Sequence, residues 1–460
     1  MPGEVDRSYA LKLASFAAEL IHHSADAHVR HVASTRLADT VACMRGAFTS
    51  DAVRQAKKMA ARYSTVAANV PGSSIPGSTE RVSIEAAAFV NGIAARYLDF
   101  NDIYLSKEAV HPSDNIPSAM ALAEALESTG EALLTALIVG YEIHCRLADT
   151  VSTRKGKWDN VILGAIAASV MAGSLLKLDT EQQADAICMA TVGNIALMET
   201  RVGSLSMWKA AAAAYASRAG VFAALAASEG LKGPGLALEG THGLFAQVTG
   251  YPEKDIFTTP IQGFHLLDTH MKAYPAQYFT QTAISAALSV RGQIDIAQVE
   301  KITVNTFEFG RIAAADSAEK WNPTTRETAD HSMPYCVAVA LRDGELNEAS
   351  FEPACIARED VRALMRKIGV KEDPSLTAQY PEKVATRIQV ELRGGRSAQA
   401  LVEYPLGHSR NPMSTEDLTA KFVGLSGNTD ASRSLLSDLM NIEDHDGPST
   451  SALLRRITQV

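Results

Sequence analysis

Residues 196–220, ALMETRVGSLSMWKAAAAAYASRAG, contain the alanine run around which the rest of the chain is organised. Alanine has the highest helix propensity, and small side chains let neighbouring backbones approach closely. The run therefore predicts a tightly packed helix that begins near Ser204 or Ser206. With Ser206 as the N-cap, Lys209 falls in the first turn, where a cation opposes the helix dipole. That position favours an anion held by Lys209, the free backbone amides and Arg201. The alternative is a solvated lysine at a frayed helix end.

The chain on the N-terminal side of this helix is also helical. From about residue 9 to about residue 250, apolar residues recur at helical spacing, and several segments contain enough alanine to be buried on most sides. After Phe264 the pattern changes, and residues 296–310, IAQVEKITVNTFEFG, alternate and are β-branched as in a strand. We therefore expect a mainly α protein, with a large all-helical domain over residues 1–264 and a smaller α+β domain over residues 265–406.

The second half of the chain contains further local signals. Gly394–Gly395 joins two strand-like runs within residues 381–407, which predicts a hairpin. Residues 358–370, REDVRALMRKIGV, predict one of the shorter helices of the α+β domain. Residues 407–460 return to a helical pattern, and we expect them to pack back on the first domain.

The composition excludes several classes of protein. The 460 residues are 47% hydrophobic and 21% charged, and the formal net charge of −9 argues against general affinity for nucleic acid or for an anionic membrane surface. No uninterrupted apolar run reaches the roughly 18 residues of a membrane span. The N-terminal residues lack the apolar core of a signal peptide, so we expect a protein of the cytoplasm, or of an organelle matrix after import. The five scattered cysteines form no CxxC pair, which predicts reduced thiols and no metal site.

Polar side chains that helix packing does not explain occur first in residues 97–115, YLDFNDIYLSKEAVHPSDN. An apolar helix leads into Asp99 and Asp102, and a loop then reaches His111, which Pro112 forces towards extended backbone. The alternative for each of them is ordinary surface, with solvated carboxylates at a helix end and a histidine in a loop.

Two later stretches have the same character. Lys272 stands three residues before Pro275, beside aromatic residues and ahead of a predicted helix, which repeats the anion-binding pattern of Lys209. Residues 322–341, NPTTRETADHSMPYCVAVAL, gather polar groups ahead of an apolar helix, and these are Arg326, Glu327, Asp330, His331 and Tyr335. Loops this dense in polar groups before a rigid element are often functional. The alternatives are a solvated lysine and a solvated loop followed by a core helix.

Together these groups match elimination chemistry on a polycarboxylate. Removing a proton beside a carboxylate needs a base, expelling hydroxide needs an acid, and the carboxylates themselves need cations or amides. The chain supplies candidates for each role: Asp99 and His111 for proton transfer, Tyr335 or His331 for the leaving hydroxyl, and Lys209, Lys272 and Arg326 as carboxylate ligands.

The same motifs resemble those of the MmgE/PrpD family, which includes 2-methylcitrate dehydratases, cis-aconitate decarboxylases and iminodisuccinate epimerases. The resemblance runs from about residue 14 to about residue 424, and it is carried by YLDFND…HPSDN, MWKAAAAAYASRAG, MKAYPAQYFTQTAI and, above all, TRETADHSMPYCVAVALRDG. It implies a helical domain completed by the C-terminal residues, an α+β lid, an active site between them and a homodimer. By this resemblance, the residues at the family's active-site positions are Asp99, His111, Lys209, Lys272 and Tyr335. His331 and Arg326 lie within the matched motif.

Three positions bear on the choice of reaction within this family. Where the animal decarboxylase has a threonine shortly after the aspartate, this chain has Ile103. Where that enzyme has a histidine after the lysine–proline motif, this chain has Gln277, a candidate for substrate binding. Many relatives have a histidine after Trp-Asp, where this chain has Asn160, so the substrate can differ from methylcitrate. The resemblance favours the dehydratase branch over the decarboxylase.

We therefore expect a cofactor-independent hydro-lyase that dehydrates 2-methylcitrate, citrate or a close di- or tricarboxylate, with His111 or Asp99 as the base and no metal. A second hypothesis keeps the site and changes the reaction to decarboxylation of cis-aconitate or epimerisation of an amino-dicarboxylate. A third, from a different class, is a catalytically silent helical scaffold or ligand sensor on the same fold. The concentration of reactive side chains argues against this third hypothesis.

Overall fold

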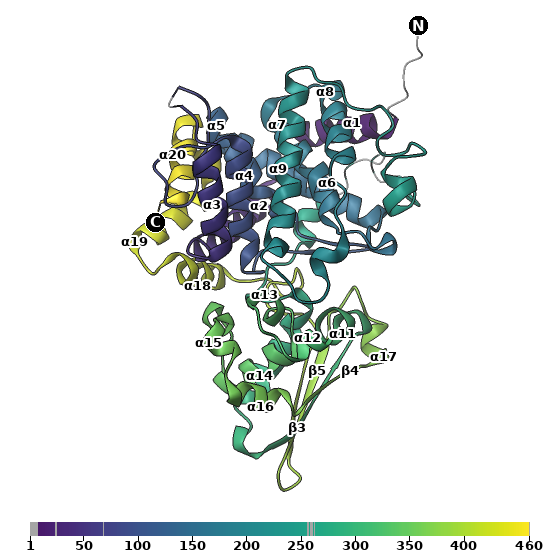
Figure 1. Ribbon diagram of the computed structural model, residues 1–460, viewed down its shortest axis with the longest axis vertical. Coiled ribbons are helices and arrows are strands. Elements are labelled where there is room, and N and C mark those ends of the chain that lie inside the picture. Colours follow the sequence, from purple (N-terminus) through teal and green to yellow (C-terminus); the bar gives the residue numbers. More distant parts are fainter. Residues whose placement is uncertain are drawn as a thin grey trace.

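The computed structural model describes residues 8–23, 25–67, 69–254, 257, 261 and 263–459. Figure 1 shows a large group of helices above a smaller part that contains the strands, which confirms the expected mainly α fold with a smaller α+β domain. The helical domain contains α1 (Ser8–His22), α2 (Ala27–Gly46), α3 (Asp51–Tyr63), α4 (Ile84–Tyr97), α5 (Ile116–Leu126), α6 (Gly130–Thr150), α7 (Val161–Leu176), α8 (Thr180–Val192) and α9 (Trp208–Ser228).

Helix α9 is the predicted alanine-rich helix, and it lies at the centre of the helical domain in contact with α4, α7 and α8. The packing is so close that a Cβ added to Gly220 would collide with the carbonyl oxygen of Ala165 in α7. The helix starts slightly later than predicted. Met207 is its N-cap residue, and Ser206 Oγ accepts a hydrogen bond from the Trp208 amide at 3.3 Å. Small side chains therefore set the spacing of the helical core.

By length and composition alone, α9 is apolar enough to cross a membrane, although its sequence contains no uninterrupted apolar run of that length. Of its most apolar window, 67% is buried inside the helical domain. This burial is what a core helix requires, because its apolar surface is covered by neighbouring helices.

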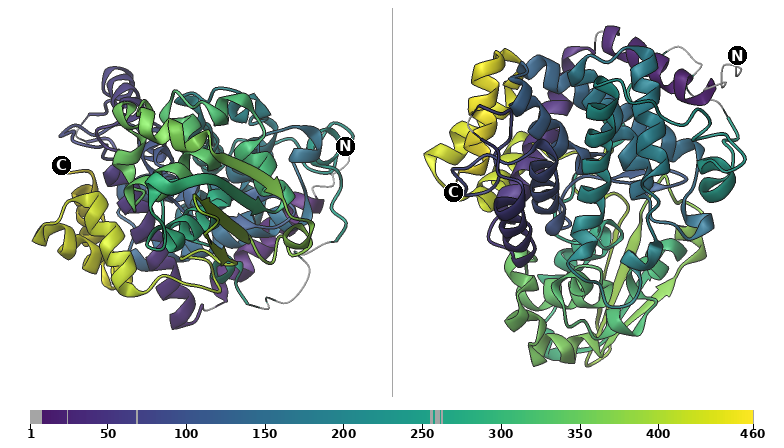
Figure 2. Two further views of the ribbon diagram at one scale, coloured as in Figure 1. Left: turned by 90° about the horizontal axis from the view of Figure 1, so that it is seen from below. Right: turned by 45° about the horizontal axis from the view of Figure 1, so that its top comes forward.

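The C-terminal domain holds a four-stranded sheet in the order β4-β3-β5-β6. Strand β3 pairs in parallel with β4 and antiparallel with β5, and β5 pairs antiparallel with β6. Figure 2 (left) shows the sheet from below, with helices of this domain packed against it. The elements are α10 (Gln281–Arg291), β3 (Val299–Thr306), α11 (Glu308–Ala315), α12 (Ala318–Trp321), α13 (Arg326–Ala329), α14 (Met333–Asp343), α15 (Pro353–Ile356), α16 (Glu359–Met365), β4 (Ile368–Glu372), α17 (Pro374–Thr377), β5 (Thr386–Leu392) and β6 (Ser397–Val402).

Two predictions about this sheet had different outcomes. The predicted hairpin is confirmed, since β5 and β6 are joined through Gly394 and Gly395, whose φ angles of 80° and 79° suit a tight turn. The single helix predicted over residues 358–370 is wrong, because α16 ends at Met365 and the chain continues into β4. A short apolar run is ambiguous between helix and strand, and here pairing with β3 decides the outcome.

The last part of the chain returns to the helical domain, as α18 (Thr415–Ser426), α19 (Asp430–Met440) and α20 (Gly447–Thr458). Helices α18 and α19 pack on α2, and α20 packs on α5. In Figures 1 and 2 these yellow helices lie beside the purple and blue helices of the N-terminal part. Helix α18 also supports the predicted site, because Lys421 Nζ donates to the carbonyl oxygens of Phe100 at 2.9 Å and Lys272 at 3.0 Å.

Candidate active site

The site is organised around the buried carboxylate of Asp99, which follows the C-terminal end of α4. Asp99 has a left-handed φ of 50°, uncommon for a residue with a side chain, and is only 1% exposed. Its Oδ1 accepts hydrogen bonds from Arg96 Nη1 and from Lys272 Nζ, the latter at 2.7 Å. Lys209 Nζ lies 3.1 Å from its Oδ2. One carboxylate thus holds three cations together.

Lys209 is therefore not a solvated lysine at a frayed helix end, because it is fully buried beside Asp99. The anion expected near the first turn of α9 is a side chain of the protein itself. A second carboxylate, Asp330 Oδ1, lies 3.8 Å from Lys209 Nζ on the other side. Lys209 does not line the cavity described below and stands behind Asp99.

The pKa values of Asp99 and Lys272 indicate different roles for these two residues. Burial raises the pKa of Asp99, but Arg96, Lys209 and Lys272 outweigh burial and hold that pKa well below its usual value. Burial, opposed by Asp99, lowers the pKa of Lys272 to about 8. Asp99 is thus a poor proton acceptor. Lys272 is a cation that gives up a proton easily.

Asp330 and His331 form a hydrogen-bonded pair at the same place. The fully buried carboxylate of Asp330 accepts a hydrogen bond from His331 Nδ1, so the network assigns the imidazole proton to Nδ1. His331 Nε2 lies 3.4 Å from Asp99 Oδ2, and the side chain is 12% exposed on the cavity. Burial, together with Lys209, lowers the pKa of His331, so the ring is neutral near pH 7. Its Nε2 lone pair is available to the cavity.

His111, unlike His331, is held through both of its ring nitrogens. Strands β1 (Tyr104–Leu105) and β2 (Ala109–Val110) form a short antiparallel turn that brings His111 back to Asp102. His111 Nδ1 donates to the Asp102 carbonyl oxygen at 2.6 Å, and Nε2 accepts from Arg96 Nη2 at 3.1 Å. Burial, with Arg96 and Lys272, keeps the pKa of His111 well below its usual value. Both ring nitrogens are therefore occupied within the protein.

These groups meet at a cavity of about 460 Å³ between the helical and C-terminal domains. Of the residues predicted from the sequence, it is lined by Asp99, His111, Lys272, Gln277 and His331, and also by Ile103 and Asn160. Gln277 Nε2 donates to the Ala313 carbonyl oxygen at 3.3 Å, while its buried Oε1 has no hydrogen-bond partner among the residues that the structure describes. Asn160 Nδ2 donates to the Ala109 carbonyl oxygen at 2.5 Å, which ties the amide to β2.

Besides Lys209, the predicted residues Tyr335 and Arg326 lie outside the cavity wall. Tyr335 is fully buried in the core of the C-terminal domain, where its hydroxyl donates to the Ser350 carbonyl oxygen at 2.5 Å. The Arg326 guanidinium lies over the rings of Tyr97 and Phe351, 5.3 and 5.2 Å from their centroids. The contacts of both side chains are those of packing residues, so the geometry gives no support to a part in proton transfer or carboxylate binding.

Several charged residues of the cavity were not among the sequence predictions. Arg96 touches both Asp99 and His111, yet in the sequence it is one more charged residue in an amphipathic helix. Lys320 lines the wall, and its Nζ donates to the Ala313 carbonyl oxygen at 2.7 Å. Two ion pairs also line the cavity. One joins Arg154 with Glu108, and in the other Arg201, which was predicted to hold an anion together with Lys209, is paired with Asp159. No local motif marks the two ion pairs, because their partners lie 46 and 42 residues apart in the chain.

The possibility of a metal site was tested on the donor groups. In the part of the chain that the structure describes, Asp99, Asp330 and His331 offer ligand atoms that all lie within 4.8 Å of one another. Lys209 and Lys272 already supply positive charge to these carboxylates at hydrogen-bonding or near-contact distance. The donor set therefore does not fit a metal ion, and we derive no step through one.

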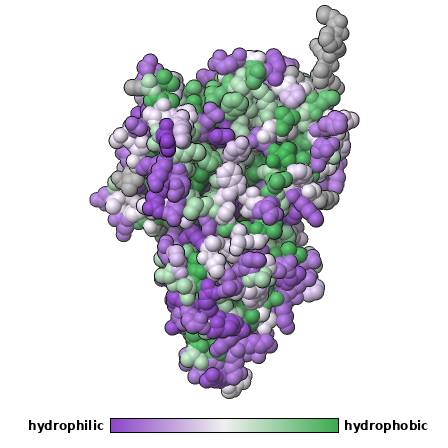
Figure 3. Space-filling model, viewed as in Figure 1, coloured by the Kyte–Doolittle hydropathy of each residue, from purple (hydrophilic) through white to green (hydrophobic). Residues whose placement is uncertain are grey.

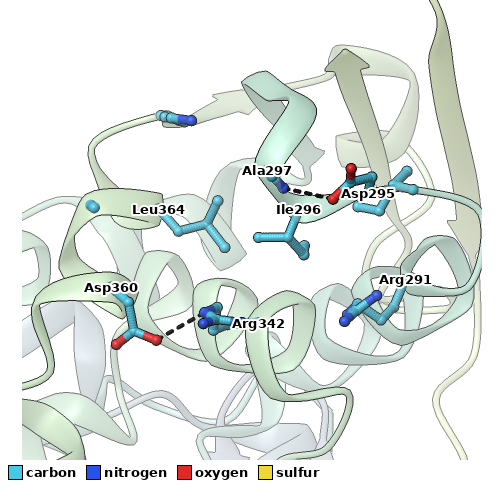
Figure 4. Close-up of a pocket in the computed structure, with 10 residues that line it drawn as sticks. Arg291, Asp295, Ile296, Ala297, Arg342, Asp360 and Leu364 are labelled. Atoms are coloured by element: carbon cyan, nitrogen blue, oxygen red, sulfur yellow. Dashed lines mark hydrogen bonds and ion pairs between the residues drawn. The ribbon is translucent and has the colours of Figure 1, made fainter. Parts of the chain in front are cut away.

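A larger hollow of about 670 Å³ lies within the C-terminal domain, beside α10, α14 and α16 (Figure 4). Two of its polar groups are engaged locally, since Arg342 Nε donates to Asp360 at 2.8 Å and the Ala297 amide donates to Asp295 at 3.0 Å. None of the predicted site residues lines it, and its lining contains no histidine. The inter-domain cavity is therefore the better candidate for an active site.

Comparison with known proteins agrees with this organisation. The model of the MmgE/PrpD N-terminal domain matches residues 11–256, and the model of the MmgE/PrpD C-terminal domain matches residues 274–434. The chain is 32% identical over 364 residues to the 2-methylcitrate dehydratase of Escherichia coli (strain K12), which covers 74% of each chain. It is 29% identical over 381 residues to the mitochondrial 2-methylcitrate dehydratase of Yarrowia lipolytica, covering 76% of this chain and 72% of the relative.

A relative of different activity has a similar level of identity. The cis-aconitate decarboxylase of Homo sapiens is 27% identical over 403 residues, which cover 84% of this chain and 82% of the relative. Dehydratases and a decarboxylase thus share this chain's architecture, and identity near these values does not choose between the two reactions. The two domain models together span most of the chain, and on this basis the protein belongs to the MmgE/PrpD family of lyases.

Proposed function

We propose that the protein is a hydro-lyase that removes water from 2-methylcitrate, citrate or a close di- or tricarboxylate without a cofactor. The observation that carries this proposal is the arrangement at the cavity floor. There the Asp330–His331 pair offers an imidazole nitrogen on one side of Asp99, and Lys272, whose pKa is about 8, contacts the other oxygen of the same carboxylate. A base and an acid of suitable pKa in one buried site are what an elimination requires.

Binding of the substrate depends on positive charge that the protein leaves accessible. Lys272 faces the cavity from its floor, and Lys320 faces it from the C-terminal domain with backbone carbonyl oxygens as its hydrogen-bond acceptors. The Lys320 ammonium can receive a substrate carboxylate, while Lys272, which donates two of its three N–H groups to Asp99, keeps one for the substrate hydroxyl. The unpartnered Oε1 of Gln277 can accept a hydrogen bond from a substrate hydroxyl.

The elimination then needs one proton acceptor and one proton donor. His331 Nε2 removes the proton from the carbon beside a substrate carboxylate, and Asp330 stabilises the imidazolium that forms. The electron pair of the C–H bond becomes the new C=C bond as the C–O bond breaks. Lys272 gives a proton to the departing hydroxyl, which leaves as water. Asp99 positions Lys272, and His111 positions Arg96.

Decarboxylation of cis-aconitate is the second candidate, supported by the similarity to the human decarboxylase. Ile103 and Gln277, which stand where the resemblance places a threonine and a histidine in the animal enzyme, both line the cavity. The apolar side chain of Ile103 removes a polar group from the wall beside the substrate. This change favours dehydration over decarboxylation at this site.

The proposal predicts product formation without metal. Purified protein incubated with 2-methylcitrate, citrate and cis-aconitate in the presence of EDTA is expected to give 2-methylaconitate or aconitate, identified by NMR. Itaconate from cis-aconitate would move the protein to the decarboxylase reaction. A further incubation with an amino-dicarboxylate tests epimerisation, which would give inversion at carbon without loss of water. Binding of carboxylates with no turnover of any of them would instead support a ligand sensor.

The rate is expected to show a bell-shaped dependence on pH. His331 must be neutral to accept a proton, and its pKa lies below the usual 6.5, so kcat/KM falls only in the acid region below that value. Lys272 must be charged to donate, so kcat/KM falls again as the pH rises through about 8. Profiles measured between about pH 5 and about pH 10 test both limbs. Lys272→Arg, whose guanidinium keeps its proton, should remove the alkaline limb, and an unchanged limb would assign it to another group.

The homodimer that the family resemblance implies remains a proposal. On the outer side of α9, Trp208, Tyr215 and Phe222 recur every seven residues and are 51%, 43% and 55% exposed. Figure 3 shows that hydrophobic side chains are frequent on this face of the helical domain, whereas the C-terminal domain is mostly hydrophilic. A second copy of the chain could cover this stripe, and sedimentation velocity measures whether it does.

A further inference from the structure

The inter-domain cavity has charged side chains at its floor and apolar side chains at its mouth. Its floor is charged and closed to solvent, with Asp99 at 1% and Lys272 at 0% exposure. At its mouth, Val202 and Ile312 line the same cavity and remain 54% and 40% exposed. Apolar side chains that line an entrance lose contact with water when an apolar part of a ligand covers them, and this burial favours binding.

The apolar mouth is formed by both domains. Met198 and Val202 come from the segment that precedes α9, and Phe309 and Ile312 come from α11 of the C-terminal domain. All four face a cavity of about 460 Å³, a size typical of sites for small organic ligands. A ligand on the charged floor therefore has room to extend between two apolar walls.

The charged side chains of the lining do not change this picture, because most of them are satisfied within the protein. Arg154 Nη2 lies 3.0 Å from Glu108 Oε1, and its guanidinium also stacks over Phe309 at 4.2 Å. Arg201 Nε lies 3.1 Å from Asp159 Oδ2. Asp316 Oδ1, which also lines the cavity, lies 2.9 Å from Arg311 Nη1. Lys320 is thus left for a substrate carboxylate, and the apolar side chains beside it can meet the outer part of a ligand.

We propose that the preferred substrate is a polycarboxylate with an unbranched apolar substituent longer than methyl, its carboxylates on the floor and its chain between Val202 and Ile312. This rests on the proposed function and specifies its substrate class. The chain would cover the exposed side chains and leave the charged groups on the floor free for the reaction. A fully buried methylene contributes about fourfold in affinity, so a partly covered one gives about two- to fourfold in kcat/KM.

The test is a series of 2-alkylcitrates with methyl, propyl and pentyl substituents, assayed with the full-length protein. The propyl compound is expected to exceed the methyl compound in kcat/KM by about fourfold to sixteenfold, from two added methylenes at two- to fourfold each. A flat series, or one that falls after methyl, overturns the inference while leaving the dehydratase proposal intact. If none of the 2-alkylcitrates is turned over, the proposed function fails. Calorimetric affinities for the same compounds would still show which length of alkyl substituent the cavity prefers.

Substitutions at the mouth of the cavity test where the alkyl substituent of the substrate lies. Val202→Ser and Ile312→Ser are each expected to flatten the series, because each removes apolar surface from one wall of the mouth. The matched control is Leu197→Ser, since Leu197 is 62% exposed nearby in the sequence but does not line the cavity. This control should keep the wild-type chain-length dependence. Equal effects of all three variants, or a dependence that survives both mouth variants, would contradict the placement of the chain.

Discussion

His331→Asn is expected to lower kcat by about 10²–10⁴-fold with little change in the folded structure. The asparagine amide can still donate to Asp330 where His331 Nδ1 now does, so the carboxylate keeps its partner. The amide cannot accept a proton at the position of Nε2, so the general base is lost. The acid limb of the pH profile should disappear with it, a change that a loss of stability alone would not produce. Steady-state kinetics and the pH profile of the residual rate measure both effects.

His111→Asn is the comparison that separates the two histidines of the cavity. It keeps a donor for the Asp102 carbonyl oxygen but removes the acceptor of Arg96. We expect a rise in KM, through displaced Arg96, and a smaller fall in kcat than for His331→Asn. His28→Asn, on the exposed face of α2, serves as the control for the substitution itself. A large loss of kcat in His111→Asn with near-normal His331→Asn would assign the base to His111.

The sequence predicted helices and strands correctly wherever the conformation that a segment prefers by itself is also the one that its contacts in the fold require. The alanine run, the strand at residues 299–306 and the glycine hairpin all follow from propensity, alternation and turn chemistry. Strand β4 was missed because residues 368–372 follow a helix directly and contain too few residues to show a period. Only the edge of β3, which lies far back in the sequence, makes this segment extended.

The site was predictable to the level of residue type but not of role. Asp99, Lys209, Lys272 and His331 are polar groups in unusual sequence surroundings, and the structure brings them together. The sequence could not show that Lys209 is neutralised by Asp99 from within the protein. It also could not show that the Tyr335 hydroxyl is bound to the Ser350 carbonyl oxygen, because both facts depend on contacts between distant segments.

Asp99→Asn is expected to have the largest effect on stability, because it leaves Arg96, Lys209 and Lys272 buried without their shared anion. Breaking a buried ion pair by removing one partner costs about 3–5 kcal/mol of unfolding free energy. The pKa of Asp99 is depressed in the folded protein, so its stabilisation is complete above the unfolded pKa of about 3.9 and is lost as the pH falls through the folded value. The difference between wild type and variant should therefore be constant near neutral pH and shrink in acid. Denaturant unfolding at several pH values measures this difference.

A second substitution distinguishes lost charge balance from lost packing. Lys209→Met removes one of the buried cations, so in the Asp99→Asn background it should recover about 1–3 kcal/mol of the lost unfolding free energy. The exposed pair Lys301–Glu391 provides the control, and Glu391→Gln should cost no more than about 1 kcal/mol. If the changes in unfolding free energy caused by Asp99→Asn and Lys209→Met are instead additive, Asp99 does not act as the common counter-ion. Coupling would mean that Asp99 is the counter-ion of Lys209. Since the same carboxylate lies 2.7 Å from Lys272 Nζ, one residue would then both support the fold and position the proposed proton donor.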